Sequence, residues 1–292
     1  MLLIEQMKKE DTFTDSQKVI IDYMISKKQE IEHMTLKELA EETYTSPASF
    51  VRVAKKMGYD GFEQFRDAFL SEQRYLDAHF QEIDPNLPFG PNDHYMTIAN
   101  RLATLVKETI DDSLALVDYR KLKAAVNIIK MAEAIHISAI SYPLLYARDF
   151  QLKMRRIGKR VEITELVGEQ LYTAPIMGKN DCAIILSYSG ETPLNVDMIK
   201  IFKKKQIPII AITSRGENTL RSNADVVLDV TTREKLYSKI AGYTNEFSMK
   251  YILDLLYSCY FSEEYELFLD YKRSLSKRSE PGRFSDTEIL KE

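Results

Sequence analysis

The sequence predicts two domains: an all-α helix-turn-helix domain at the N-terminus, and an α/β domain with a five-stranded parallel sheet in a three-layer sandwich. Two observations carry this prediction. Apolar residues recur at helical spacing in successive segments between residues 14 and 81. From residue 134 on, short β-branched runs alternate with helical patterns, which is typical of a parallel sheet covered on both faces. A chain of 292 residues is long enough to bury two cores.

The composition is that of a soluble globular protein, with 45% apolar and 29% charged residues. The N-terminus lacks the features of a signal peptide, and no apolar run has the roughly 18 residues of a membrane span. The two cysteines lie in apolar segments, which indicates buried thiols, and the four histidines show no metal-ligand spacing. We therefore expect a cytoplasmic protein without a metal or other cofactor. The net charge of −4 argues against non-specific coating of nucleic acid but allows a local basic element.

Two short helices with a tight turn between them are predicted near residue 40. Thr35 and Glu38 have the spacing of a capping box, so a helix is expected to begin there. After the turn at residues 43–45, Ser46 is a typical N-cap and Pro47 a typical first helical residue. The arrangement is that of a helix-turn-helix.

The second of these helices is predicted to read DNA. Its apolar residues fall on one stripe, and residues 46–57 contain no acid. A cationic, hydroxyl-bearing outer face suits a helix that enters a major groove between two phosphate rows. The alternative is a solvated basic face on an ordinary helix. The candidate DNA-binding residues are Ser46, Ser49, Arg52, Lys55 and Lys56.

The best domain boundary lies at residues 84–93, which contain three prolines and one glycine. We predict a DNA-binding domain at residues 1–81, a linker at 82–93, a second domain at 94–271 and a flexible tail at 272–292. Within the second domain, strand-like runs lie at residues 134–140, 160–163, 182–186, 207–212 and 224–230.

The loop after the third strand-like run is the main candidate for a ligand site. Ser187, Ser189, Gly190 and Thr192 have the pattern Ser-x-Ser-Gly-x-Thr, and a helix is predicted to begin at Pro193. The helix N-terminus offers free N–H groups, and the glycine lets the backbone approach a ligand closely. We expect this loop to bind phosphate without a metal. It is not a Walker A loop, because Gly-Lys-Ser/Thr is absent. The alternative is an ordinary serine-rich turn.

Three further residues are candidates for the same pocket, because ligands of open parallel sheets bind beyond the carboxyl ends of the strands. Ser141 follows the first strand-like run and Ser214 ends the fourth. Glu234 follows the last one, where it could act as an acid/base or accept a hydrogen bond from a sugar hydroxyl. The alternative for Glu234 is a solvated carboxylate at the start of a helix.

Taken together, the two motifs resemble the RpiR family of bacterial transcriptional regulators, which join a helix-turn-helix to a SIS (sugar isomerase) domain. The resemblance covers roughly residues 1–260. Its N-terminal part rests on Leu36-x-x-Leu39-Ala40, Ser46-Pro47-Ala48-Ser49-Phe50-Val51-Arg52, Lys55-Lys56-Met57-Gly58-Tyr59 and Gly61-Phe62-x-x-Phe65. Its C-terminal part rests on Ala147-Arg148-Asp149-Phe150, Arg156-Ile157-Gly158-Lys159, Ser187-x-Ser189-Gly190-Glu191-Thr192 and Ile212-Thr213-Ser214.

The resemblance implies that the SIS domain is a sensor, with Ser187, Ser189 and Thr192 holding the phosphate of a sugar phosphate. It also implies that the second helix of the motif meets the operator. The chain departs from the family pattern at residues 139–143, where a Gly-x-Gly-x-Ser type turn is usual and both glycines are absent. Tyr142 and Pro143 would narrow the sugar end of such a pocket.

Three interpretations follow from the sequence. The favoured one is a cytoplasmic regulator whose operator binding responds to a sugar phosphate, acting as a homodimer or homotetramer on a pseudo-palindrome. The second is a phosphosugar isomerase or lyase with a helical appendage, although Glu234 lacks an obvious acid/base partner in the pocket loops. The third is a SIS scaffold that joins DNA-binding heads and senses nothing.

Overall fold

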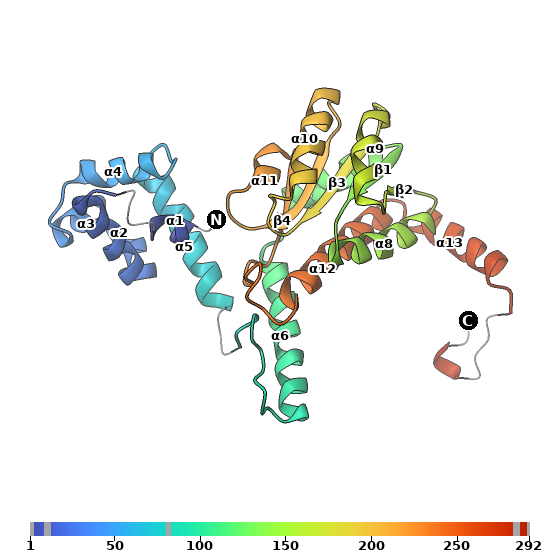
Figure 1. The fold of residues 1–292 in the computed structure, drawn as a ribbon, viewed down its shortest axis with the longest axis horizontal. Coiled ribbons are helices and arrows are strands. Elements are labelled where there is room, and N and C mark those ends of the chain that lie inside the picture. Colours follow the sequence, from blue (N-terminus) through green and yellow to red (C-terminus); the bar gives the residue numbers. More distant parts are fainter. Residues whose placement is uncertain (1–2, 9–12, 80–82, 283–286, 291–292) are drawn as a thin grey trace. The chain divides into compact units, whose positions relative to one another are not determined.

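The computed structural model describes residues 3–8, 13–79, 83–282 and 287–290. The chain divides into two compact units, one formed mainly by residues up to Asp84 and the other mainly by residues from Pro85 on (Figure 1). Neither unit contains, within those ranges, a helix long and apolar enough to cross a membrane.

The N-terminal unit is all-helical, as predicted. Its helices pack around a buried apolar cluster in which Phe50 and Phe65 are fully buried. The Phe50 and Phe62 rings meet edge to face with centroids 5.1 Å apart. The expected end of the last helix near residue 81 lies outside the described residues. The elements are α1 (Leu3–Met7), α2 (Asp15–Lys27), η2 (Lys28–His33), α3 (Leu36–Glu42), α4 (Pro47–Lys56) and α5 (Phe62–His79).

The C-terminal unit contains the predicted five-stranded parallel sheet, in the order β2-β1-β3-β4-β5. The strands are β1 (Ala134–Ser138), β2 (Arg160–Ile163), β3 (Cys182–Ser187), β4 (Ile209–Ser214) and β5 (Val226–Val230). The helices are α6 (Tyr95–Ala115), α7 (Tyr119–Met131), α8 (Tyr142–Arg155), η3 (Val167–Glu169), α9 (Gln170–Ile176), α10 (Pro193–Lys205), α11 (Thr219–Asn223), α12 (Thr244–Ser262), α13 (Tyr265–Ser279) and η4 (Glu288–Leu290).

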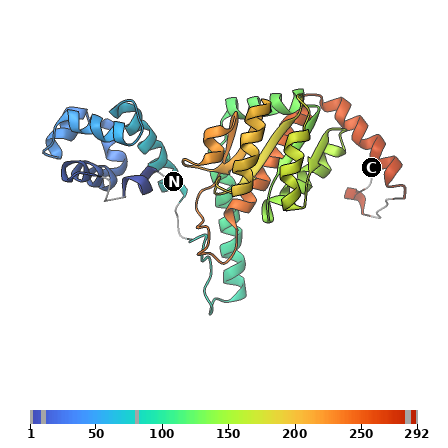
Figure 2. The same cartoon turned by 45° about the horizontal axis from the view of Figure 1, so that its top comes forward.

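Helices cover both faces of this sheet, which confirms the three-layer prediction (Figures 1 and 2). The period of two along β3 shows the physical reason. Ile184 and Leu186 pack into the cluster with α7, α8 and α12, whereas Ala183 and Ile185 pack into the cluster with α9, α10 and α11. Because every residue of β3 is buried, the strand is a continuous apolar run instead of an alternating one.

The strand order places the candidate ligand site. The chain runs from β1 outward to β2 on one side, and from β3 through β4 to β5 on the other. The connections therefore leave the sheet in opposite directions at the carboxyl ends of β1 and β3, which opens a crevice there. The loops that begin at Ala139 and at Tyr188 border this crevice.

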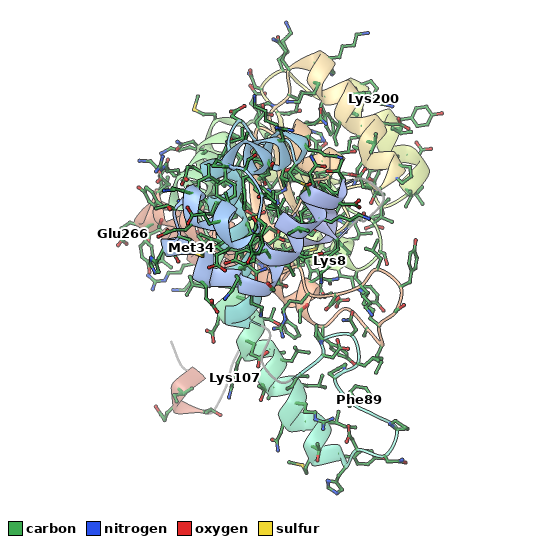
Figure 3. The ribbon with its side chains drawn as sticks, turned by 90° about the vertical axis from the view of Figure 1, so that its left-hand side faces the viewer. Lys8, Met34, Phe89, Lys107, Lys200 and Glu266 are labelled. Atoms are coloured by element: carbon green, nitrogen blue, oxygen red, sulfur yellow. The ribbon has the colours of Figure 1, made fainter. Side chains whose placement is uncertain are left out.

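Residues 85–93, inside the predicted linker, pack against the C-terminal unit. Asn86 is buried, and its side-chain oxygen accepts a hydrogen bond from the Lys235 N–H at 2.7 Å. Its carbonyl accepts one from the Ile240 N–H at 2.9 Å. Figure 3 shows Phe89 of this segment beside α6. The segment thus holds the loop between β5 and α12. At the other end of the unit, α13 continues to Ser279, so residues 272–279 of the predicted tail are helical.

The two cysteines are free thiols in different surroundings. Cys182 is buried in β3, and burial raises the pKa of its thiol to about 12, so it is an unreactive core residue. Cys259 on α12 is only half-buried, and desolvation raises the pKa of its thiol as well. The expectation of buried thiols is confirmed for Cys182 and only partly for Cys259.

Candidate ligand pocket and DNA-binding helix

A cavity of about 210 Å³ lies at the crevice between the carboxyl ends of β1 and β3. Its wall combines hydroxyls, two asparagines and one ammonium group with apolar side chains. A second hollow of about 410 Å³ adjoins it and shares Pro143, Tyr188, Leu236, Lys239 and Asn245. The cavity is lined by Ile140, Pro143, Leu186, Ser187, Tyr188, Ser189, Thr192, Asn195, Leu236, Lys239 and Asn245.

The hydroxyls of the predicted phosphate loop meet at this cavity. The Ser187 and Thr192 hydroxyl oxygens lie 3.0 Å apart. Thr192 is the N-cap of α10, but its side chain makes no capping hydrogen bond. The first-turn N–H groups of α10 are therefore left without a side-chain cap, beside hydroxyls that can donate to an anion. This geometry suits a phosphate group.

The packing of the phosphate loop requires a glycine at position 190. Its φ of +68° is in the region that favours glycine, and a Cβ there would lie 2.1 Å from the Asn218 Oδ1 atom. The Gly190 carbonyl also accepts a hydrogen bond from the Leu220 N–H at 3.1 Å. The glycine lets the phosphate loop press against the start of α11.

Glu191 also joins the phosphate loop to α11. Its carboxylate accepts hydrogen bonds from the Thr219 N–H at 2.6 Å and the Thr219 hydroxyl at 2.7 Å. Ser214, one of the predicted ligand residues, donates its N–H to the Tyr188 carbonyl at 3.2 Å. Glu191 and Ser214 are not among the residues that line the cavity, and their contacts hold the loop in place.

Ser141 is exposed and does not line the cavity either. It adopts φ 63° and ψ −137°, a conformation that glycine accepts and other residues rarely do. Both glycines of a Gly-x-Gly-x-Ser type turn are absent from this loop, and Ser141 adopts the strained conformation instead. The next residues shape the pocket: Pro143 lines the cavity, and Tyr142 lines the adjoining hollow.

Glu234 caps helix α12 and is not solvated. Its side chain is completely buried. One carboxylate oxygen accepts hydrogen bonds from the Thr244 N–H, from the Thr244 hydroxyl at 2.9 Å and from the Asn245 N–H at 3.2 Å. The other pairs with the Lys239 ammonium at 2.8 Å. The alternative of a solvated carboxylate is therefore wrong, although the position at a helix start is right.

Lys239 is the cation of the cavity, and the sequence reasoning missed it. Its ammonium lies 5.6 Å from the centroid of the Tyr188 ring, while the Tyr188 hydroxyl donates to the Glu234 carbonyl at 2.9 Å. The ion pair with Glu234 uses one of the three ammonium donors, which leaves donors for a ligand oxygen. No sequence pattern distinguishes Lys239 from Lys235 in the same loop.

The predicted helix-turn-helix is present at α3 and α4. Thr35 and Glu38 form the capping box: the Thr35 N–H donates to the Glu38 carboxylate at 2.7 Å and holds the pKa of that carboxyl below its usual value. In the turn, Tyr44 has φ 51° and is 98% exposed. An exposed aromatic residue at this turn is a further candidate for DNA contact that the sequence reasoning did not single out.

The predicted DNA-binding side chains of α4 divide into two groups. Arg52 and Lys55 are exposed, with no hydrogen bond or ion pair to any described residue. The Lys56 ammonium instead lies 5.0 Å from the centroid of the Phe13 ring, so this side chain contacts a residue of its own domain. Ser46 is the N-cap of α4 but pairs its hydroxyl with that of Ser49 at 2.9 Å. The outer face of α4 is thus centred on Arg52 and Lys55.

Comparison with known families agrees with both units. The family model described as "Helix-turn-helix domain, rpiR family" matches residues 1–73, and the model described as "SIS domain" matches residues 128–254. The chain thus joins an rpiR-family helix-turn-helix domain to a SIS domain. A helix-turn-helix transcriptional regulator of Haemophilus influenzae is 26% identical over 248 residues, which are 85% of this chain and 85% of that protein.

Solved structures share the fold. The Vibrio vulnificus NanR protein, in complex with ManNAc-6P, aligns with 97% of this chain and 100% of its own at 21% identity and a TM-score of 0.60. The sugar isomerase domain of an RpiR transcription factor from Sphaerobacter thermophilus aligns with 61% of this chain and 98% of its own, at 19% identity and a TM-score of 0.55. A putative sugar-phosphate isomerase from Listeria monocytogenes covers 65% of this chain and 100% of its own, at 15% identity and 0.55.

The packing of Gly190 predicts a cost for any side chain at this position. Gly190→Ala should lower the free energy of unfolding by about 2 kcal/mol, because it combines a positive φ with a clash against Asn218. Urea unfolding followed by circular dichroism measures this change. Gly168→Ala is the control, since its added methyl group meets no atom within 4 Å and its φ is not positive. Equal stability of the two variants would contradict the account of the loop.

Proposed function

We propose that this chain is a transcriptional regulator whose operator binding is modulated by a phosphorylated sugar bound in the cavity of its SIS domain. The observation that carries the proposal is the hydroxyl-lined cavity at the N-terminus of α10, on the same chain as the exposed cationic face of α4. The corresponding parts are a DNA-binding domain at 1–81, a linker at 82–93 and a sensor domain at 94–271.

The chemistry of the cavity favours a sugar phosphate over a simple anion. Ser187, Ser189 and Thr192 stand at the helix N-terminus, where a phosphate is stabilised. Asn245 and Lys239 line the same cavity farther along the chain and suit sugar hydroxyls or ring substituents. The ManNAc-6P bound to the Vibrio vulnificus NanR protein supports this ligand class for the present chain.

The alternative function is a phosphosugar isomerase, and one observation favours it. Glu246 lines the adjoining hollow and accepts a hydrogen bond from the Tyr146 hydroxyl at 2.7 Å. Isomerisation needs a base that can reach a carbon-bound proton. Both oxygens of Glu234 are occupied by α12 and Lys239, so Glu234 is poorly placed for that role. We propose a sensor instead of an enzyme, because neither a second carboxylate nor a histidine accompanies Glu246 among the described residues that line the hollow.

We further propose that the regulator is a cytoplasmic homo-oligomer, either a homodimer or a homotetramer. One helix-turn-helix contacts only a half-site, and a two-fold pair of recognition helices matches a pseudo-palindromic operator. The exposed Leu145 and Leu152 on α8 offer apolar surface for such an assembly.

The exposed face of α4 predicts the effect of one substitution. Arg52→Ala should weaken operator binding at least about tenfold, because it removes a cation that is free to contact phosphate or a base edge. The melting temperature should stay the same, since the side chain makes no contact that stabilises the domain. Gel shifts with operator DNA measure binding, and Arg273→Ala on α13 is the control. Unchanged binding by Arg52→Ala would refute the assignment of α4.

The hydroxyl-lined cavity predicts that a sugar phosphate binds and that its binding depends on the serine hydroxyls. A thermal-shift screen of ManNAc-6P, glucosamine 6-phosphate, glucose 6-phosphate and ribose 5-phosphate should give at least one rise in melting temperature. The rise should disappear in Ser189→Ala and persist in Ser262→Ala, which removes an exposed hydroxyl at the end of α12.

No rise with any sugar phosphate would instead support the scaffold interpretation. Conversion of a bound probe into another sugar phosphate, followed by ³¹P NMR, would support the isomerase.

A further inference from the structure

Asn195 is a buried polar residue of the cavity that no motif identifies. It lies in the first turn of α10, is 1% exposed and lines the cavity beside the hydroxyl loop. One end of its side-chain amide lies 2.9 Å from the Ser138 hydroxyl at the end of β1. No described residue hydrogen-bonds the other end, which leaves that end to the cavity. Whether this end is a carbonyl or an NH₂ group decides what the cavity can bind.

The neighbouring Gln170 amide has only one possible orientation. Its nitrogen lies 3.2 Å from the Ala139 carbonyl and 3.0 Å from the Thr164 carbonyl. Both partners are acceptors, so the NH₂ group must face them. The Gln170 oxygen therefore faces the Ser138 hydroxyl, at 2.9 Å. Because an amide oxygen only accepts, Ser138 must donate its proton to Gln170.

The Ser138 hydroxyl has a single proton, and this fixes the orientation of the Asn195 side-chain amide. Once the proton is used on Gln170, the serine oxygen can only accept from its other neighbours. The Met198 sulfur, 3.5 Å away, is a weak acceptor and cannot compete with an amide oxygen. Asn195 must then turn its NH₂ group toward Ser138, because an oxygen there would face serine lone pairs. The positions of oxygen and nitrogen in a side-chain amide are assigned from its hydrogen-bond partners.

We infer that Asn195 presents its carbonyl oxygen to the cavity, and that it selects ligands with a hydroxyl or N–H donor beside the phosphate. This inference rests on the proposed function, since it concerns the sugar part of the same ligand. A carbonyl repels phosphate oxygens, so the phosphate stays at Ser187–Thr192 and the sugar faces Asn195. Ser138 and Gln170 are positioning residues that hold the amide in this orientation.

A double-mutant cycle tests the inference, with ManNAc-6P, glucosamine 6-phosphate and inorganic phosphate as probes in isothermal titration of the full chain. Asn195→Ala should weaken sugar-phosphate binding about tenfold, and Ser138→Ala about fivefold, because the freed amide loses its orientation. The double variant should be no weaker than Asn195→Ala, whereas independent effects would give about 50-fold. Binding of inorganic phosphate should stay unchanged. Ser113→Ala, which removes another buried hydroxyl of this unit, is the control.

The inference would be overturned if the two substitutions weakened sugar-phosphate binding multiplicatively in the double variant. It would also be overturned if they weakened the binding of inorganic phosphate equally. A second measurement needs no ligand: neutron diffraction from deuterium-exchanged crystals of the full chain. Deuterium on the Asn195 atom that faces Ser138 supports the inference, and deuterium on the atom that faces the cavity overturns it. If the wild-type chain binds none of the probes, the proposed function fails, while the neutron map still decides the orientation of the amide.

Discussion

The hydrogen bonds and ion pair of the buried Glu234 carboxylate are the interactions on which the candidate ligand pocket depends. A buried charge is tolerated only when it is paired and hydrogen-bonded. Glu234 meets this condition by joining the first turn of α12, the Lys239 ammonium and, through its backbone, the Tyr188 hydroxyl. The loop between β5 and α12 is thereby fixed over the end of β3. Without this carboxylate, Lys239 would lose its ion pair at the cavity wall.

Residues close in sequence were predictable, because local rules govern them. The capping box of Thr35 and Glu38 and the start of α10 at Pro193 follow from spacing alone. The contact of Asn195 was not predictable, because its partner lies far away in the sequence. Lys239 pairs with Glu234 nearby in the chain, but its position at the cavity also depends on Tyr188, which is distant in sequence. Ser138 is 57 residues from Asn195, and no pattern in one chain marks such a pair. Glu234 was found as a candidate, but its capping role depends on how α12 packs.

The loop after β1, which lacks the glycines of a Gly-x-Gly-x-Ser type turn, shows the same limit of prediction from sequence. The absent glycines were visible in the sequence and predicted a narrower sugar end. The structure has a cavity of about 210 Å³ beside this loop with Pro143 on its wall, and Ser141 takes the strained conformation.

For a ligand to regulate DNA binding, it must bind one state of the protein more tightly than another. The decisive measurement is therefore the affinity for a fluorescent operator fragment, by anisotropy at fixed salt, with and without the sugar phosphate that stabilises the protein most. The account predicts a change of at least about fivefold that is lost in Ser187→Ala. Equal operator affinity with and without a saturating sugar phosphate would contradict it.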